Sequence, residues 1–413
     1  MLALALLASL TAAGAKGATG AAAETPRFSW PQTVWEAHYG GTADGDYAVR
    51  AIALDRRDSV IVAGHTSQEV GYGVHQVPLV LKFNSEGGRA WSRTSLGRFR
   101  SPRGEAQFVA AHESGEVSVV GYVGESETDP LMFRVLSRFD AKGKLLWSRT
   151  LTLPGTYRFR PAAVAAAPGG DIVVAGETTR IDPPEGTDWC VVRLGPKAVV
   201  RWTRIGDNQK TGATAAAAVA VDAAGNAVAI GRGRIGFSQE RWLAEGYGPK
   251  GQKGLYIWPD PDAACTRQLA HRIGPCGRGF LIAGEQVCTI REAVASAVFV
   301  KKLDRAGGIL WTANLPTEGK VAFVGALPNG GAVVAGEERG AGDEEGAAWP
   351  VAMRLNAAGD LVMACRGLMK DESYARYAAG AVDQEGFLVV AGESTALVKG
   401  EPVRRIFVRK MKF

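Results

Sequence analysis

The sequence is poor in the residue types that most often perform catalysis and bind metals. Only five histidines and five cysteines occur among 413 residues. The histidines are too scattered to build a ligand cluster, and the cysteines form no pair of CxxC motifs. No G-x-S-x-G, H-E-x-x-H, P-loop or dinucleotide-binding motif occurs in a suitable context. We therefore predict no metal and no cofactor, and we assign no catalytic residue.

Clustered basic charge and long apolar runs are also missing. The net charge is +6, but the lysines and arginines are scattered, which argues against a nucleic-acid partner. No segment approaches the ~18 apolar residues of a membrane helix, so no membrane span is expected. The short apolar start "MLALALLASL" is followed by small residues, which is typical of a secretory signal. We predict a signal peptide over 1–23, one domain over 24–413, a secreted, periplasmic or cell-surface location, and a monomer.

Glycine is abundant, and one glycine-containing phrase recurs along the chain. It reads "VVAG" or a close variant, and its period is about 55 residues. A tryptophan follows most copies, as in "LKFNSEGGRAW" (81–91). The glycines that close the phrase are Gly64, Gly121, Gly176, Gly231, Gly284, Gly336 and Gly392. Such a repeat indicates one structural unit copied seven times.

Each unit has the pattern of four short strands separated by turns. Runs of β-branched and apolar residues alternate with Gly, Pro, Asn and Asp, and no helical periodicity is sustained. Four-stranded units of this length form β-propeller blades. Small-residue segments such as "ATAAAAVAVD" (213–222) suit the crowded inner strand, and the tryptophans suit packing between blades. We predict an all-β, seven-bladed β-propeller.

The last unit ends at "RRIFVRKMKF" (404–413) without its tryptophan. The segment "TVWEAHYGG" (33–41), with Trp35, resembles the missing strand. We therefore predict that the N-terminal strand completes the last blade and closes the ring, which leaves no open sheet edge.

With these phrases the chain resembles the bacterial secreted β-propeller repeat proteins, whose blades read AG-x-T, then LD-x-x-G, then W. The resemblance covers about residues 30–413. It implies an extracellular or cell-envelope protein that binds partners. A more distant likeness to quinoprotein repeats is limited, because the turn in "DAKGKLLW" (140–147) is one residue shorter and lacks their Thr.

The residues that follow the repeated glycines are candidate ligand-binding residues at the loop-rich rim of the propeller. Four are acidic. Antiparallel pairing places Glu177 opposite about Asp188, and the third-strand base Arg193 then lies ~15 Å away, too far for an ion pair. We expect these glutamates to be solvated, paired with another loop, or functional. The candidates are Glu177, Glu285, Glu337, Glu393, His65, Tyr122 and Arg232.

A second group of candidates is basic and comes from two neighbouring units. The segments "GRFRSPR" (97–103) and "TYRFR" (156–160) place arginines beside aromatic residues, which suits anionic or glycan ligands. We expect one basic patch outside the ring of glutamates. Its members are Arg98, Arg100, Arg103, Arg158 and Arg160.

The odd number of cysteines requires at least one unpaired thiol or an intermolecular bond. The first hairpin of the fifth unit turns near Pro275, which places Cys265 opposite residues 285–288. We predict a Cys265–Cys288 disulfide, with Cys276 as the competing partner.

These observations favour a non-enzymatic binding scaffold for an unknown protein or glycan partner. The alternative is an enzyme that uses the central pocket, either a glycan-acting lyase or hydrolase or a degenerate quinoprotein-like enzyme. Two carboxylates, or a carboxylate facing His or Tyr near the axis, would favour the enzyme.

Overall fold

The structure is a computed structural model of the 413-residue chain. The segment predicted to be a signal peptide, 1–23, lies outside the described residues. Within the described part no helix is long and apolar enough to cross a membrane. The structure describes residues 27–28, 31–42, 46–70, 73–97, 103–124, 133–153, 157–180, 187–206, 213–235, 239–257, 265–277, 279–290, 293–315, 317–339, 348–367, 372–398 and 401–413.

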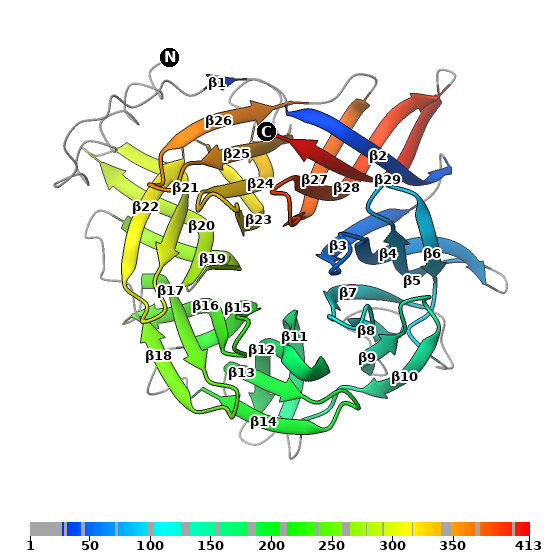
Figure 1. The fold of residues 1–413 in the computed structure, drawn as a ribbon, viewed down its shortest axis with the longest axis horizontal. Helices are drawn as coiled ribbons and strands as arrows, with labels where there is room; N and C mark the ends of the chain where they lie inside the picture. Colours follow the sequence, from blue (N-terminus) through cyan, green and yellow to red (C-terminus); the bar gives the residue numbers. More distant parts are fainter. Residues whose placement is uncertain are drawn as a thin grey trace.

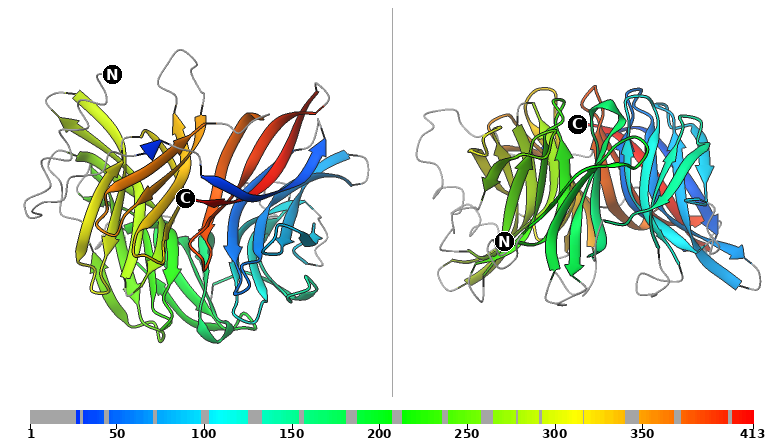
Figure 2. Two further views of the ribbon diagram at one scale, coloured as in Figure 1. Left: turned by 45° about the horizontal axis from the view of Figure 1, so that its top comes forward. Right: turned by 90° about the horizontal axis from the view of Figure 1, so that it is seen from below.

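The described residues form an all-β propeller, as predicted, with four-stranded antiparallel blades set radially around an axis (Figure 1). The sheets stand along that axis when seen from the side (Figure 2). Three blades contain β3 (Tyr47–Leu54), β4 (Val60–Val70), β5 (Gly73–Phe83) and β6 (Arg89–Arg93); β7 (Gly104–Ala111), β8 (Val117–Val123), β9 (Phe133–Phe139) and β10 (Leu145–Thr150); and β11 (Tyr157–Ala166), β12 (Ile172–Arg180), β13 (Thr187–Leu194) and β14 (Val200–Ile205).

Two further blades involve the N-terminal strands. In one, β1 (Arg27–Phe28) adds in parallel to the outer strand β26. In the other, β2 is the outer strand. Their members are β23 (Gly319–Ala326), β24 (Ala332–Arg339), β25 (Ala348–Leu355) and β26 (Leu361–Arg366); and β27 (Glu372–Val382), β28 (Leu388–Val398), β29 (Glu401–Lys412) and β2 (Gln32–Thr42).

The remaining strands form one eight-stranded sheet, so five blades stand as separate sheets and not the seven predicted. A parallel bridge joins β17 to β19 through Glu240–Arg267 and Arg241–Gln268, and it makes two antiparallel groups continuous. The strands are β15 (Ala213–Val221), β16 (Ala227–Ile235), β17 (Gln239–Tyr247), β18 (Lys253–Ile257), β19 (Cys265–Cys276), β20 (Gly279–Ile290), β21 (Ala293–Leu303) and β22 (Ile309–Leu315).

The N-terminal strand β2 pairs with β29 in antiparallel register, with Ala37 opposite Val408. The ring of Trp35 covers Gly87 in the β5–β6 turn of the neighbouring sheet, and its Nε1 donates to the carbonyl oxygen of Ser85 at 2.8 Å. Gly87 has φ +84°, and a Cβ there would lie 2.8 Å from the indole. A glycine is therefore needed both for the turn and for the close approach of the ring.

The same arrangement recurs in other sheets. Trp91, Trp202 and Trp311 cover positive-φ glycines in the next sheet and donate to carbonyl oxygens there. The tryptophans predicted to pack between blades do so at these positions.

The repeated "AG" glycines lie where the second strand passes closest to the inner strand. A Cβ on Gly176 would lie 2.1 Å from the carbonyl oxygen of Arg160, and the other six glycines of the series meet the same obstacle at 1.7–2.1 Å. Each inner strand has a β-bulge at this level, for example between Pro161 and Ala163. The bulge inserts one extra residue and turns its side chain away from the regular alternation.

Candidate functional site

The bulged residues of the inner strands surround the axis of the propeller. They are Arg50, Gln107, Ala162, Ala217, His271, Ala322 and Ala378. Six of them line two pockets, and these pockets share His271. Four of the seven are alanines, and their short side chains fill little of these pockets.

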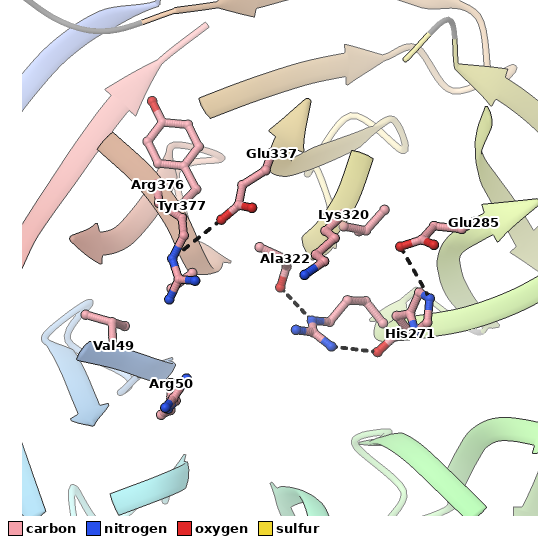
Figure 3. A pocket seen from close by; sticks show the side chains of 12 residues that line it. Val49, Arg50, His271, Glu285, Lys320, Ala322, Glu337, Arg376 and Tyr377 are labelled. Carbon is pink, nitrogen blue, oxygen red and sulfur yellow. Dashed lines mark hydrogen bonds and ion pairs between the residues drawn. The ribbon is translucent and has the colours of Figure 1, made fainter. Parts of the chain in front are cut away.

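The first pocket has a volume of about 360 Å³ and is strongly charged. Figure 3 shows Arg376, Glu337, Lys320 and Glu285 pointing into one opening. These side chains come from the inner strands β23 and β27 and the second strands β20 and β24. The lining residues are Val49, Arg50, His271, Arg272, Glu285, Lys320, Val321, Ala322, Glu337, Arg376, Tyr377 and Ala378.

The glutamates predicted at the rim pair with bases on the inner strands. Arg376 Nε lies 2.8 Å from Glu393 Oε2 and 3.5 Å from Glu337 Oε1. Glu393 also accepts a hydrogen bond from the backbone N–H of Val49 at 2.5 Å, which links β28 to β3. Of the three expected states, solvated, paired with another loop or functional, the first two do not describe Glu393, because its partner Arg376 lies on the facing inner strand.

Glu337 and Glu285 are held less tightly. Burial raises the pKa of Glu337, and Glu393 adds to this, while Arg376 and Lys320 oppose it. Glu285 Oε1 lies 3.6 Å from His271 Nε2. Burial lowers the pKa of His271, so its imidazole is neutral near pH 7.

The second pocket, of about 380 Å³, has an alanine-rich floor and a basic edge. Arg160, Glu177 and Arg232 line it together with Ala162, Ala215, Ala216, Ala217 and Arg267. Arg160 Nη1 lies 3.3 Å from Glu177 Oε1, because the two residues are cross-strand partners. Arg160 therefore belongs to the axial side and not to the outer basic patch that the sequence predicted.

Two of the predicted rim residues are buried. His65 is 5% exposed, and its Nδ1 lies 2.7 Å from Glu105 Oε1, which Arg50 Nε also contacts at 2.6 Å. Tyr122 is likewise 5% exposed, with the guanidinium of Arg134 over its ring. His65 thus contacts the inner strand β7 through Glu105, and neither His65 nor Tyr122 lines the two axial pockets.

The rest of the predicted basic patch is only partly described. Arg98 and Arg100 lie outside the described residues, and the structure describes the backbone of Arg158 in β11 but not its side chain. Arg103 Nη2 lies 3.1 Å from His75 Nε2 of the neighbouring sheet.

The basic residues of the third strands form ion pairs at the end of the sheets that lies away from the rim glutamates. Glu177 pairs in register with Trp189, one residue from the predicted position, and Arg193 lies opposite Val173. Arg193 Nε instead lies 2.9 Å from Asp171 Oδ2, and Lys82 Nζ lies 2.8 Å from Asp55 Oδ2. The prediction that these bases cannot reach the rim glutamates is confirmed.

Cys265 and Cys288 form a disulfide, and the register of β19 and β20 places them directly opposite each other. The other three cysteines, Cys190, Cys276 and Cys365, are free and buried. Burial raises the pKa of Cys190 to about 12, so this thiol stays protonated.

Comparisons with known proteins identify the fold and no family. No protein-family model matches the chain, and no curated protein matches it. The β-propeller domain of the Trilobed protease from Pyrococcus furiosus is 10% identical over 88% of this chain and 94% of that chain, with a TM-score of 0.51. The polysaccharide lyase Uly1 is 11% identical over 87% and 89%, with a TM-score of 0.47. A protein of unknown function from Dyadobacter fermentans is 10% identical over 92% and 99%, with a TM-score of 0.46. At these identities the likeness concerns the propeller fold alone.

Sequence reasoning missed the inner-strand residues Arg50, His271, Arg272, Lys320 and Arg376. A signal for them was present, because each lies 12 to 16 residues before an "AG" glycine, on the strand that faces it. Arg50 and His271 are themselves bulged residues, and no residue type in the repeat specifies that bulge. Lys320 and Arg376, in contrast, lie in regular register opposite Glu337 and Glu393.

Proposed function

We propose that this protein is a secreted or cell-envelope β-propeller that binds a protein or glycan ligand in the axial pocket without catalysing a reaction. One observation carries the proposal: charged side chains from four inner strands meet in a single pocket on a rigid sheet scaffold. Binding residues on such a scaffold keep their geometry without the ligand, which reduces the entropic cost of association.

We further propose that the eight-stranded sheet acts as two blades, so that seven blades form a ring closed by β2. Two residue pairs are the whole of the β17–β19 bridge, and four strands lie on each side of it. Contacts of β27 with β3 support the closure, as does the packing of Trp35 on Gly87.

The proposed location outside the cytoplasm is supported by the Cys265–Cys288 disulfide, since such bonds persist in oxidising compartments. The resemblance to secreted propeller repeats points the same way.

The pocket can be tested by filling it. Ala322→Phe and Ala378→Phe place a ring in the opening, whereas Ala306→Phe lies in an exposed turn at the opposite end and serves as the control. Binding to envelope glycans and envelope proteins should be lost in the first two variants and kept in the third, at unchanged melting temperature. Retained binding in both pocket variants would place the ligand elsewhere.

A second candidate, a glycan-acting lyase or hydrolase, is favoured by the facing pair of Glu285 and His271 beside the axis. A neutral histidine next to a carboxylate can serve as a general base. Turnover of a glycan panel that His271→Gln and Glu285→Gln both abolish would support the enzyme. Absence of turnover in the wild type would leave the binding function.

A further inference from the structure

Arg272 is a cation without an anionic partner in a partly buried position. Its Nε donates to the carbonyl oxygen of Ala322 at 2.6 Å, and its Nη1 donates to that of His271 at 2.9 Å. Both acceptors are neutral, and no carboxylate of the described residues lies within 4.0 Å of the guanidinium. Burial lowers the pKa of Arg272, which shows that its surroundings disfavour the charge. The two bonds use two of the five N–H donors of a guanidinium, so donors remain for a ligand.

Lys320 brings a second cation into the same pocket from the next inner strand, β23 (Figure 3). It is exposed, and in the described part of the chain no carboxylate oxygen lies within 4.0 Å of its ammonium. Lys320 lies opposite Glu337 in the strand pair β23–β24, but the carboxylate of Glu337 has Arg376 as its ion-pair partner, with Nε 3.5 Å from Oε1.

Glu285 and Glu337 therefore have His271 and Arg376, respectively, within 4.0 Å, whereas Arg272 and Lys320 have no carboxylate oxygen of the described residues within that distance. The pocket that these two side chains line has a volume of about 360 Å³, and the bulged residues Ala322 and Ala378 line it with them. A guanidinium and an ammonium lining one opening suit an oxygen anion, which a guanidinium fork binds through two parallel hydrogen bonds.

We propose that Arg272 and Lys320 bind an oxyanion of the ligand: a carboxylate, sulfate or phosphate group. This inference rests on the proposed binding function and narrows its ligand to an acidic one, such as an acidic glycan. The anion would accept the remaining N–H donors of Arg272 and balance a charge that the described residues leave uncompensated.

The test is calorimetric titration of the folded protein at low ionic strength with three probes: glucuronate, inorganic sulfate and inorganic phosphate. We expect at least one probe to bind, and Lys320→Gln and Arg272→Gln each to weaken it at least about tenfold, the loss expected for a charge-assisted hydrogen bond. Lys250→Gln, which removes an exposed cation from a turn at the opposite end, should leave binding unchanged. Because Lys320 is exposed, its variant remains informative if Arg272→Gln destabilises the protein.

The probe that binds identifies the chemical group of the anion. Binding of glucuronate alone indicates a carboxylate, and binding of sulfate or phosphate alone indicates that group. The inference is overturned if no probe binds the wild type, or if a probe binds both variants as well as it binds Lys250→Gln. The proposed function can survive that result, because loss of envelope-ligand binding in Ala322→Phe tests the pocket independently of the ligand's charge.

Discussion

The place of the N-terminal strand in the fold leads to a quantitative prediction for Trp35→Ala. Trp35 is half-buried over Gly87 of the neighbouring sheet and donates to Ser85 at 2.8 Å. An enclosed tryptophan buries about 150–250 Å², so a half-buried one removes roughly 100 Å² from water. At about 25 cal/mol per Å², the substitution should lower the free energy of unfolding by about 2.5 kcal/mol.

Trp311→Ala is the matched control, because Trp311 is also half-buried, covers Gly359 and donates to Ala357 at 3.0 Å. It differs in lying on a strand, β22, that is continuous in sequence with its own sheet. The assay is equilibrium urea unfolding followed by tryptophan fluorescence and far-UV circular dichroism. Similar losses in both variants are expected. If Trp311→Ala is destabilised while Trp35→Ala is not, β2 contributes nothing to the stability of the propeller and the closure proposed above is wrong.

Three further predictions concern stability. Burial lowers the pKa of His112 to about 3, so on acidification the unfolded chain is protonated at this residue before the folded protein is. The free energy of unfolding should therefore fall as the pH drops from 6.5 towards 3. In urea titrations at a series of pH values, His112→Asn should make this fall smaller. Gly284→Ala places a Cβ 1.8 Å from a carbonyl oxygen and should cost more than about 2 kcal/mol, whereas Gly254→Ala, with open space around it, should change the unfolding free energy by under about 0.5 kcal/mol. Replacing Cys265 and Cys288 by Ser should cost about 3 kcal/mol, given their separation of 23 residues, and the unfolding midpoint of the double variant should not respond to reducing agents.

The repeat predicted the fold because its landmarks are steric necessities. Gly176 is required where the second strand meets the carbonyl oxygen of Arg160, and Gly87 is required beneath Trp35. Such positions tolerate one residue type, so they remain visible in a single sequence. The joining of two units into one sheet was not predictable, because the β17–β19 bridge pairs only Glu240 and Arg241 with the next unit, and the Glu240–Arg267 ion pair across it is not part of the repeat.

The same contrast explains why the site was only half predicted. The glutamates come directly after the repeated glycines, so their position in the second strand could be predicted, and Glu285 and Glu337 do line the pocket. His271, which faces Glu285, is a bulged residue, and the bulge shifts the alternation of the inner strand by one position. In regular alternation His271 and Arg272 would face opposite sides of β19, whereas at the bulge both line the pocket. The repeated glycine fixes where the second strand lies closest to the inner strand, and the bulged residue opposite that glycine determines which side chain reaches the axis. Ligand specificity can therefore change at the bulged positions without any change in the glycines that maintain the fold.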